Sequence, residues 1–456
     1  MNSQLEQTTR RQPQTMKALE DTSSRDNTGV SYRCLLRRFG RGLLTLTTAV
    51  VALISVVPVL LLFFITAVPP LVAAVLLFID VVILVVLVQR GFTPLMLSGS
   101  VVGMLTVAAV AVIASQQFAA TPPMTDAEGN VVPGSIASLE AVELNGSQQW
   151  MTIRGHREDL PVLLFLAGGP GGSELVMTRR YLSELEKHFI IVNWDQPGVG
   201  KSYYALSRDQ LTPERYVEDA YALTLHLRER FNQDKIYVLG ESWGSILGVW
   251  LVQQHPDLFH AFISTGQVVD PVENDTDMHT FALQLYREQG NMDAVEGLRR
   301  NGPPPYTADE MVGQFQAMNG VIHNYMLSHA HGEGTGHNLA LDSMRAQEYG
   351  LMDKVSWVLS LLHTFPHVYA QLNDLDLRIE APSLDVPVYF IRGRWDFNTS
   401  HRLAEEYFAL LEAPHKELIW FADSAHTPMW DEPTRFVDVL VHTVLADTWT
   451  CNQDQR

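Results

Sequence analysis

The sequence has only two cysteines among its 456 residues, Cys34 and Cys451. They lie near opposite ends of the chain, and the membrane topology inferred below puts them on opposite sides of a bilayer. That arrangement excludes an internal disulfide, so cysteine use does not indicate the redox compartment of this protein.

Charge is nearly absent from residues 43–118, which hold only Asp80 and Arg90. Residues 1–42 carry eight Lys and Arg against four Asp and Glu, a net charge of +4. Subtracting this from the −19 of the whole chain leaves −23 for residues 119–456. So acidic a domain repels nucleic-acid phosphates, and nucleic acid is therefore not an expected partner.

The uncharged region divides into three apolar runs, at 43–66, 71–88 and 94–114. Each is close to the length of about 20 residues that a helix needs to cross the hydrocarbon core of a membrane. Pro69-Pro70 separates the first two runs, since proline does not fit a helix interior. We predict three transmembrane helices over 43–118, with membrane lipid as their partner.

The distribution of Lys and Arg predicts the orientation of these helices. Four arginines lie within ten residues before the first run, and no Lys or Arg lies between the third run and Arg154. By the positive-inside rule, the N-terminus is cytoplasmic and everything after residue 118 is extracytoplasmic in a multi-pass membrane protein. Residues 1–42 are predicted to be a cytoplasmic and largely disordered tail, because the first 30 are polar and nearly free of aromatic residues.

Asp80 is a carboxyl group inside the second run, where it is costly. The other runs offer it no carboxylate, His or Lys partner, which disfavours an ion or proton pathway. We expect a protonated Asp80 that is hydrogen-bonded between helices.

After a linker at 119–139, apolar strand-like runs alternate with amphipathic helices, an order typical of a parallel sheet covered on both faces. A core over 140–269 and 386–450 is interrupted by a Pro- and Gly-punctuated helical stretch at 270–385, which we interpret as a lid. The predicted strands are 150–154, 162–166, 189–193, 236–239, 259–264, 386–392 and 416–421, and the predicted core helices are 212–231, 245–254 and 432–445.

Gly240-Glu241-Ser242-Trp243-Gly244 matches G-x-S-x-G, between an apolar strand and a helix. In this context the serine occupies a sharp turn that exposes its hydroxyl, and the glycines let strand and helix approach. The pattern predicts an α/β-hydrolase fold with Ser242 as nucleophile.

A serine nucleophile needs a base and a residue that orients the base, and in this fold they follow in the order acid, then histidine. Asp396 follows the strand at 386–392, and His426 follows the strand at 416–421. Asp423 is a rival acid but lies only three residues before the histidine, so we favour Asp396. The loop 167–172 follows the strand at 162–166, where oxyanion donors belong, and we predict the N–H groups of Gly169 and Trp243.

Two further patterns are rejected as sites. Residues 198–202 imitate the end of a phosphate-binding loop, but that pattern demands glycine where Asp195 stands. The lid histidines lack a regular ligand spacing. The lid histidines in question are His323, His329, His331 and His337. We expect neither a metal nor a cofactor.

Three segments together resemble the prolyl aminopeptidase (proline iminopeptidase) family over about residues 140–445. They are 166–172, 193–202 and 240–245. The resemblance implies removal of an N-terminal residue, often proline, from short peptides without metal or cofactor. Departures are Ala167 in place of His, Pro197 in place of Arg, and Glu241 where the family usually has Gly.

The resemblance implies that acidic lid residues hold the substrate's amine, and the lid offers Glu273, Asp275, Asp277 and Glu288 without a motif that selects among them. From these we name Glu273 and Asp277 as candidate substrate-binding residues, with Glu241 as an alternative because it lies next to Ser242. The expected substrate is a small peptide or another small molecule. An esterase or thioesterase of the same fold is an alternative, and so is a non-catalytic membrane receptor. An Asp-nucleophile reaction is disfavoured because position 242 is Ser.

Overall fold

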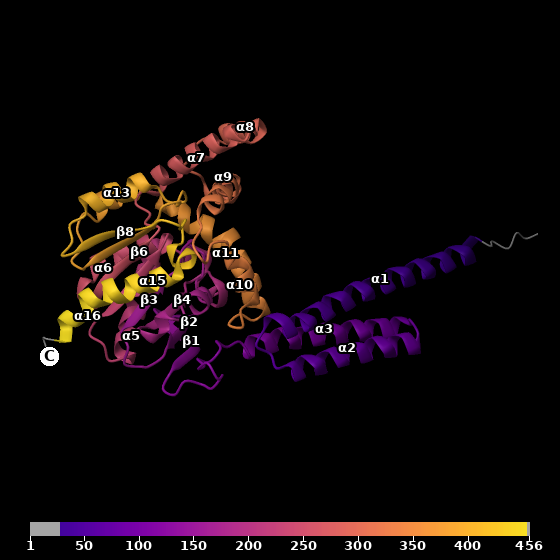
Figure 1. The fold of residues 1–456 in the computed structure, drawn as a ribbon. Helices are drawn as coiled ribbons and strands as arrows, with labels where there is room; N and C mark the ends of the chain where they lie inside the picture. The colour runs from indigo at the N-terminus through magenta and orange to yellow at the C-terminus, as the bar shows by residue number, and fades with distance from the viewer. Residues whose placement is uncertain (1–27, 454–456) are drawn as a thin grey trace, which may run out of the picture. The chain divides into compact units, whose positions relative to one another are not determined.

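The computed structural model describes residues 28–453 and separates the chain into two compact units (Figure 1). One unit comprises residues up to 56 together with 78–107, and the other comprises 57–77 together with 108–456. The first therefore holds most of three long N-terminal helices. The second holds their remaining turns, including residues 108–117, and the whole soluble domain.

The three N-terminal helices are long and apolar enough to cross a membrane. Residues 28–42 are helical, so the predicted disordered tail is wrong for them; residues 1–27, and the side chains of Cys34 and Cys451, lie outside the described part of the chain. The helices are α1 (Thr28–Ile65), α2 (Pro70–Arg90) and α3 (Pro94–Gln117).

Asp80 of α2 is fully buried within the first unit. The Ser55 hydroxyl lies 2.9 and 3.0 Å from the two Asp80 carboxyl oxygens and 2.8 Å from the Met104 carbonyl oxygen. Because a serine hydroxyl has one hydrogen, it donates to Met104 only if the carboxyl donates to it. Asp80 thus has the partner on another helix that we expected.

The soluble domain is built on an eight-stranded sheet in the order β1-β2-β4-β3-β5-β6-β7-β8. β1 and β2 are antiparallel to their neighbours, and the remaining pairs are parallel. The strands are β1 (Ile136–Leu144), β2 (Ser147–Gly155), β3 (Val162–Leu166), β4 (Ile190–Asp195), β5 (Ile236–Glu241), β6 (Phe259–Thr265), β7 (Val388–Gly393) and β8 (Lys416–Phe421).

All seven predicted strands lie in this sheet, but β1 starts inside the predicted linker. Its side chains are mostly half-buried, as expected for an edge strand, so its sequence lacks a continuous apolar run. The core helices are α4 (Met177–Tyr181), α5 (Pro213–Arg230), α6 (Trp243–Gln254), α13 (His401–Leu410), α14 (Pro428–Asp431), α15 (Pro433–Val439) and α16 (Ala446–Gln453).

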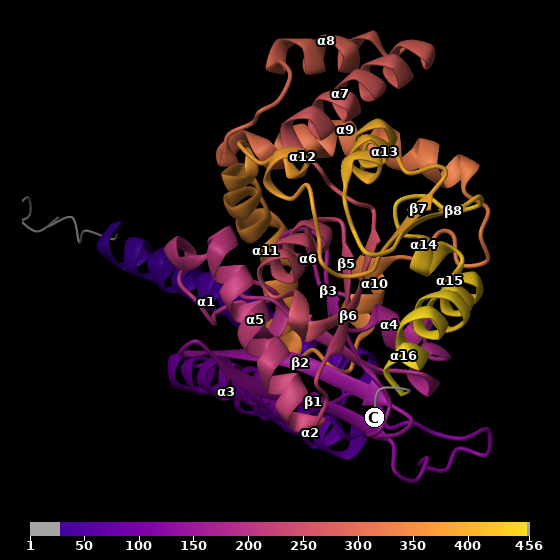
Figure 2. The same cartoon turned by 90° about the vertical axis from the view of Figure 1, so that its left-hand side faces the viewer.

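Alternate residues of the central strands face two separate apolar cores. In β3, Leu164 packs with the core under α5 and α6, while Leu163 packs with the core under α4 and α15. Figure 2 shows α5 and α15 on opposite sides of the sheet. The helix predicted over 432–445 is divided, because a π-helical segment, Leu440–Leu445, follows α15 and leads into α16.

Helices occupy the interval between β6 and β7, where we predicted a helical lid, and we keep that name for them. Thr212 and Asp270 cap α5 and the first lid helix, each accepting a backbone N–H three residues on, and proline follows each cap. The lid helices are α7 (Pro271–Glu288), α8 (Met292–Asn301), α9 (Ala308–His329), α10 (Leu339–Arg345), α11 (Leu351–Tyr369) and α12 (Leu377–Glu380).

Candidate active site

Ser242 lies on the turn between β5 and α6, with φ +52° and ψ −115°. A non-glycine residue is seldom found there, and such strain is typical of functional sites. The turn needs glycine at its close approaches: a Cβ at Gly244 would lie 2.0 Å from the Leu166 carbonyl oxygen, and one at Gly240 would lie 2.2 Å from that of Gly244. The pattern G-x-S-x-G is thus required by packing.

Asp396 and His426 come together at the ends of β7 and β8. The Asp396 carboxylate lies 3.1 Å from Nδ1 of His426. The same carboxylate accepts backbone N–H groups from Asn398 and Thr399 at 2.9 and 3.0 Å. Asp423 is exposed, and its backbone carbonyl accepts the N–H groups of His331 and Gly332. Of the two candidate acids, Asp396 is therefore the one that contacts His426.

The negative charge of Asp396 and the positive charge of His426 stabilise each other. Burial opposes ionisation of Asp396, but the His426 charge and hydrogen bond, with buried Arg392 nearby, keep its pKa well below the ordinary value. Burial lowers the pKa of His426, yet Asp396 and then Glu241 outweigh burial and raise it to about 9. Near neutral pH the imidazole is thus mainly protonated in the unliganded site.

A cavity of about 300 Å³ brings Ser242 and His426 together. Gly169 and Trp243, the predicted oxyanion donors, line it as well. Within the described residues the Ser242 hydroxyl makes no hydrogen bond, and Nε2 of His426 instead lies 3.4 Å from the Glu241 carboxylate. The serine is therefore free to meet a substrate.

Gln196 bonds to both segments that carry the predicted oxyanion donors, a role that the sequence pattern around 193–202 did not reveal. Its amide oxygen accepts the indole N–H of Trp243 at 2.9 Å, and its amide nitrogen donates to the Ala167 carbonyl at 3.2 Å. Gln196 is 1% exposed, so these bonds are shielded from water. It thereby joins the Gly-rich loop to the turn that carries Ser242.

Glu174 and Glu241 place two buried carboxyl groups on the cavity wall. Burial raises the pKa of each, and the Glu241 charge raises that of Glu174 further, while nearby His426 limits the rise at Glu241. Sequence reasoning missed Glu174, which lies just beyond the Gly-rich loop and matches no motif.

Three residues that line this cavity each have a buried acceptor oxygen without a hydrogen-bond partner among the described residues. The oxygens are Oε2 of Glu174, Oδ1 of Asn319 and Oδ1 of Asn398. Buried acceptors are nearly always satisfied in native proteins. N–H donors of a ligand would satisfy them if these side chains turned their oxygens towards the cavity.

The structure does not bring Glu273 and Asp277 into the cavity lining. Glu273 pairs with Arg378 and Arg402 at 2.8 and 3.1 Å, and Asp277 pairs with Arg402 at 3.2 Å. Both carboxylates belong instead to a network of ion pairs near the start of α7. Of the three candidate substrate-binding residues, only Glu241 lines the cavity.

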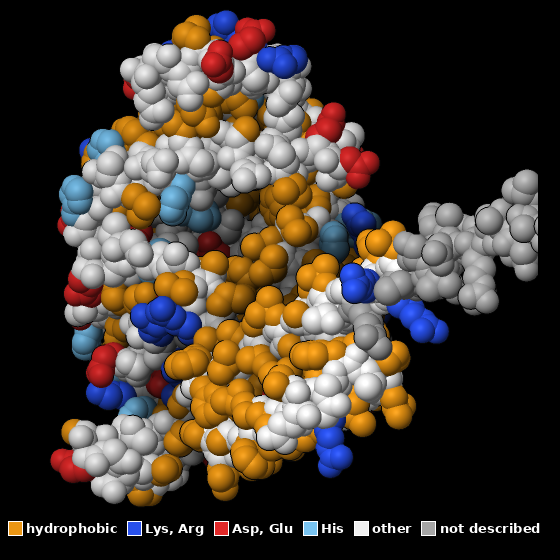
Figure 3. Space-filling model, turned by 90° about the vertical axis from the view of Figure 1, so that its right-hand side faces the viewer, with side chains coloured by type: hydrophobic (Ala, Val, Ile, Leu, Met, Phe, Trp, Pro, Cys, Tyr) orange, Lys and Arg blue, Asp and Glu red, His pale blue; other side chains and the backbone are white. Residues whose placement is uncertain are grey.

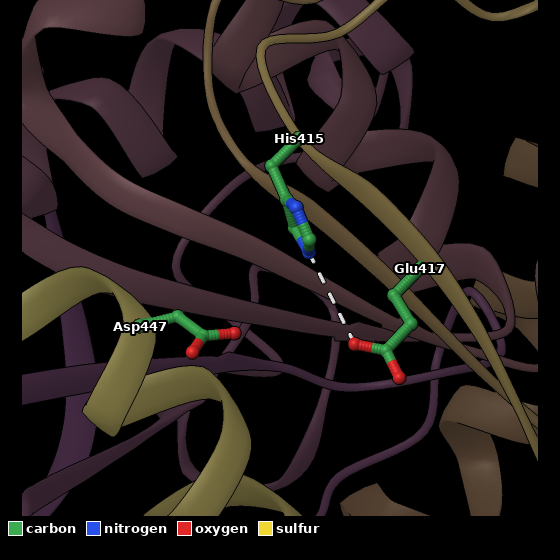
Figure 4. A group of neighbouring side chains, drawn as sticks. All are labelled: His415, Glu417 and Asp447. Atoms are coloured by element: carbon green, nitrogen blue, oxygen red, sulfur yellow. Dashed lines mark ion pairs between the residues drawn. The ribbon is translucent and has the colours of Figure 1, made fainter.

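The imitation phosphate-binding loop has structural partners. Lys201 pairs with Asp353 at 2.8 Å and is buried, and Ser202 accepts the Trp150 backbone N–H. The lid histidines form no cluster of potential metal ligands in the described part of the chain. One group there has that geometry, His415, Glu417 and Asp447 (Figure 4), but all three are exposed, and none lines the Ser242 cavity.

Comparison with known proteins places the chain in a family. The family model described as alpha/beta hydrolase fold matches residues 161–433, and the chain belongs to that family. A protein of Bacillus subtilis named as a probable aminopeptidase is 31% identical over 313 residues, covering 67% of this chain and 96% of its own. A proline iminopeptidase of Heyndrickxia coagulans is 24% identical over 61% of this chain and 88% of its own.

Among solved structures, VinJ superposes with a TM-score of 0.51 at 16% identity, covering 68% of this chain and 98% of its own. That likeness concerns the fold. The α/β-hydrolase fold and the resemblance to prolyl aminopeptidases, both predicted from the sequence, are confirmed. The matched residues 161–433 lie wholly outside the three apolar helices.

Proposed function

We propose that this protein is a membrane-anchored serine hydrolase that cleaves the N-terminal residue from short peptides or amides. One observation carries the proposal: Ser242 and His426, which is bonded to Asp396, line a cavity together with residues whose buried acceptor oxygens lack partners among the described residues. α1–α3 would anchor the enzyme, with its hydrolase domain extracytoplasmic.

In this reaction Ser242 Oγ attacks the carbonyl carbon of the first residue while His426 Nε2 takes the serine proton. The N–H groups of Gly169 and Trp243 stabilise the oxyanion. His426 then gives the proton to the leaving amine, the C–N bond breaks, and an ester to Ser242 remains. Water, deprotonated by His426, then attacks the ester carbonyl, the bond to Ser242 Oγ breaks, the free amino acid leaves, and His426 returns the proton to Oγ.

Recognition of a free amine follows from where the carboxyl groups lie. In an aminopeptidase substrate the ammonium is two bonds from the attacked carbonyl carbon, so its partner must lie beside the nucleophile. Glu241 precedes Ser242, and both approach Gly168: a Cβ there would lie 1.9 Å from the Glu241 carboxylate and 3.2 Å from Cβ of Ser242. We assign the ammonium to Glu174 and Glu241, with Asn319 and Asn398 as neutral acceptors.

The test is a substrate panel on the full-length protein in detergent micelles. It comprises aminoacyl anilides, the same anilides with an acetylated amine, and short-chain esters. We expect the free-amine anilides to be cleaved fastest, Ser242→Ala to abolish turnover, and Glu174→Gln to raise KM for free-amine substrates only. Glu273→Gln is the matched control, since that carboxylate lies in an arginine network outside the cavity.

Esterase or thioesterase activity is the second candidate, because Phe315, Leu361 and Phe365 form an apolar part of the same cavity wall. Turnover of esters alone would establish it and remove the peptidase proposal. Turnover of all substrates by Ser242→Ala would remove both. Failure of a fluorophosphonate to label the folded protein at Ser242 would favour a receptor.

A further inference from the structure

The lid helix α11 has its polar and apolar faces reversed relative to a helix on a water-soluble protein. Its inward face is largely polar, with Asp353, Lys354, Ser356, Ser360 and Thr364 each at most 7% exposed. Its outward face is a stripe of apolar residues that are 40–49% exposed, namely Met352, Val355, Val358, Leu361 and Leu362. A surface helix in water normally shows the opposite arrangement.

Four of the five inward polar residues, all except Ser356, have printed hydrogen bonds that fix the orientation of α11, whereas the buried indole N–H of Trp357 has no partner among the described residues. Lys354 donates to the Ala346 and Tyr349 carbonyls at 2.7 and 2.6 Å. Ser360 donates to the Gly171 carbonyl at 2.8 Å, in the Gly-rich loop of the active site. Rotating the helix to bury its apolar stripe would break these bonds and leave buried polar groups unpaired.

The first turn of α11 is fastened to the last turn of α3, and both segments belong to the second compact unit. The Leu351 N–H donates to the Ser115 hydroxyl at 2.9 Å, and the Gln116 amide donates to Asp353 at 2.8 Å. The third apolar span ends at Gln117. The apolar stripe therefore begins where a membrane span ends.

The outward face of α11 also lacks charge. Asp353 and Lys354 are the helix's only acidic or basic residues besides histidine, and both point inward. The domain as a whole is strongly acidic, so attraction to anionic headgroups does not explain this face. An uncharged apolar stripe suits the apolar zone of a bilayer interface, where a charge would be costly.

We propose that the stripe Met352–Leu362 of α11 is a membrane-contact surface that lies in the lipid interface beside the end of α3. Figure 3 views the right-hand side of Figure 1; much of the hydrophobic surface there belongs to the N-terminal helices, and further hydrophobic side chains lie on the soluble domain. Leu361 belongs both to the stripe and to the lining of the Ser242 cavity. The cavity wall is thus continuous with the membrane surface, which gives amphiphilic substrates an entry route.

The test uses the full-length protein carrying Cys34→Ser and Cys451→Ser, with one new cysteine at a time. Val355→Cys and Val358→Cys report on the stripe, and Leu410→Cys is the matched control, an apolar residue of α13 that is 58% exposed. Each is labelled with an environment-sensitive nitrobenzoxadiazole dye in phosphatidylcholine vesicles. Quenching by nitroxide-labelled phosphatidylcholine is then compared with quenching by aqueous iodide.

We expect lipid nitroxide to quench the labels at 355 and 358 several-fold more than the label at 410, and iodide to do the reverse. Iodide quenching at 355 equal to that at 410 would overturn the proposal. Shielding from both quenchers would also overturn it, because a protein partner or a second copy would then cover the stripe. Repeating the measurement with Ser242→Ala separates this surface from the proposed catalysis, because the label positions need no active serine.

Discussion

Replacing Glu241 with Gln should move the pH dependence of catalysis to lower pH. His426 acts as a general base only when neutral, and its pKa of about 9 means that kcat/KM rises with pH towards that value. The Glu241 carboxylate lies 3.4 Å from Nε2 and stabilises the protonated imidazole. Removing that negative charge lowers the pKa of His426, so the neutral form appears at lower pH.

The size of the shift follows from the distance. Two unit charges 3.4 Å apart attract by about 5 kcal/mol at an effective dielectric constant of about 20. Burial raises the pKa of Glu241 and so opposes its negative charge, which makes this energy an upper bound. Since one pH unit corresponds to about 1.4 kcal/mol, we expect the limb to move down by about one unit or more.

The assay measures kcat/KM of the full-length protein with a short-chain ester, from weakly acidic to strongly alkaline pH. An ester without an amine is chosen so that loss of ammonium binding does not enter the profile. Glu273→Gln is the control and should leave the limb where it is, because that carboxylate pairs with Arg378 and Arg402. A limb that stays within about 0.3 unit of wild type in Glu241→Gln, or moves up, would refute the reasoning.

Three further predictions concern one tight turn and two sets of buried hydrogen bonds. Gly244→Ala forces a Cβ onto the Leu166 carbonyl and should cost about 1–3 kcal/mol or more by thermal unfolding, whereas Gly297→Ala, in open space on α8, should be neutral or slightly stabilising; equal effects would contradict the turn argument. Gln196→Ala should lower kcat about tenfold or more with little change in KM, and an increase in KM alone would assign Gln196 to substrate binding. Ser55→Ala should destabilise the protein in lipid nanodiscs by about 1–3 kcal/mol, and Ser55→Ala with Asp80→Leu should recover most of the loss; no recovery would mean that Asp80 has another role.

The elements predicted from the sequence are those whose signal is local. The strand at 162–166 is continuously apolar because both of its faces are buried, and its predicted bounds match β3. The turn at Ser242 could be predicted because close contacts require glycine two residues before and two residues after the serine. By contrast, β1 is an edge strand with half-buried side chains, and its weak alternation resembles a linker.

The acidic side of the site was predicted less well, since a carboxyl group in a cavity and one on a surface look alike in sequence. Glu273 and Asp277 were named because they lie in the lid, but each pairs with an arginine that is distant in sequence. Glu174 was missed because only the fold carries it to the wall of the Ser242 cavity. Burial, which decides whether a carboxyl group can recognise an amine, is a tertiary property.

The same limit explains why α11 was read only as part of a lid. Its apolar residues recur at helical spacing, and in a soluble protein they would be placed inside. The inward positions are instead taken by polar groups that hold the loops around the active site, as Ser360 does at Gly171 and Thr364 does at Gly198, 2.7 Å from its carbonyl. A helix can turn its polar face towards the protein interior only if its apolar face is in contact with something other than water. The hydrogen bonds between α11 and the end of α3 place the apolar face of α11 beside the proposed membrane surface. The same orientation of α11 therefore positions the active-site loops on one face and the membrane-contact surface on the other.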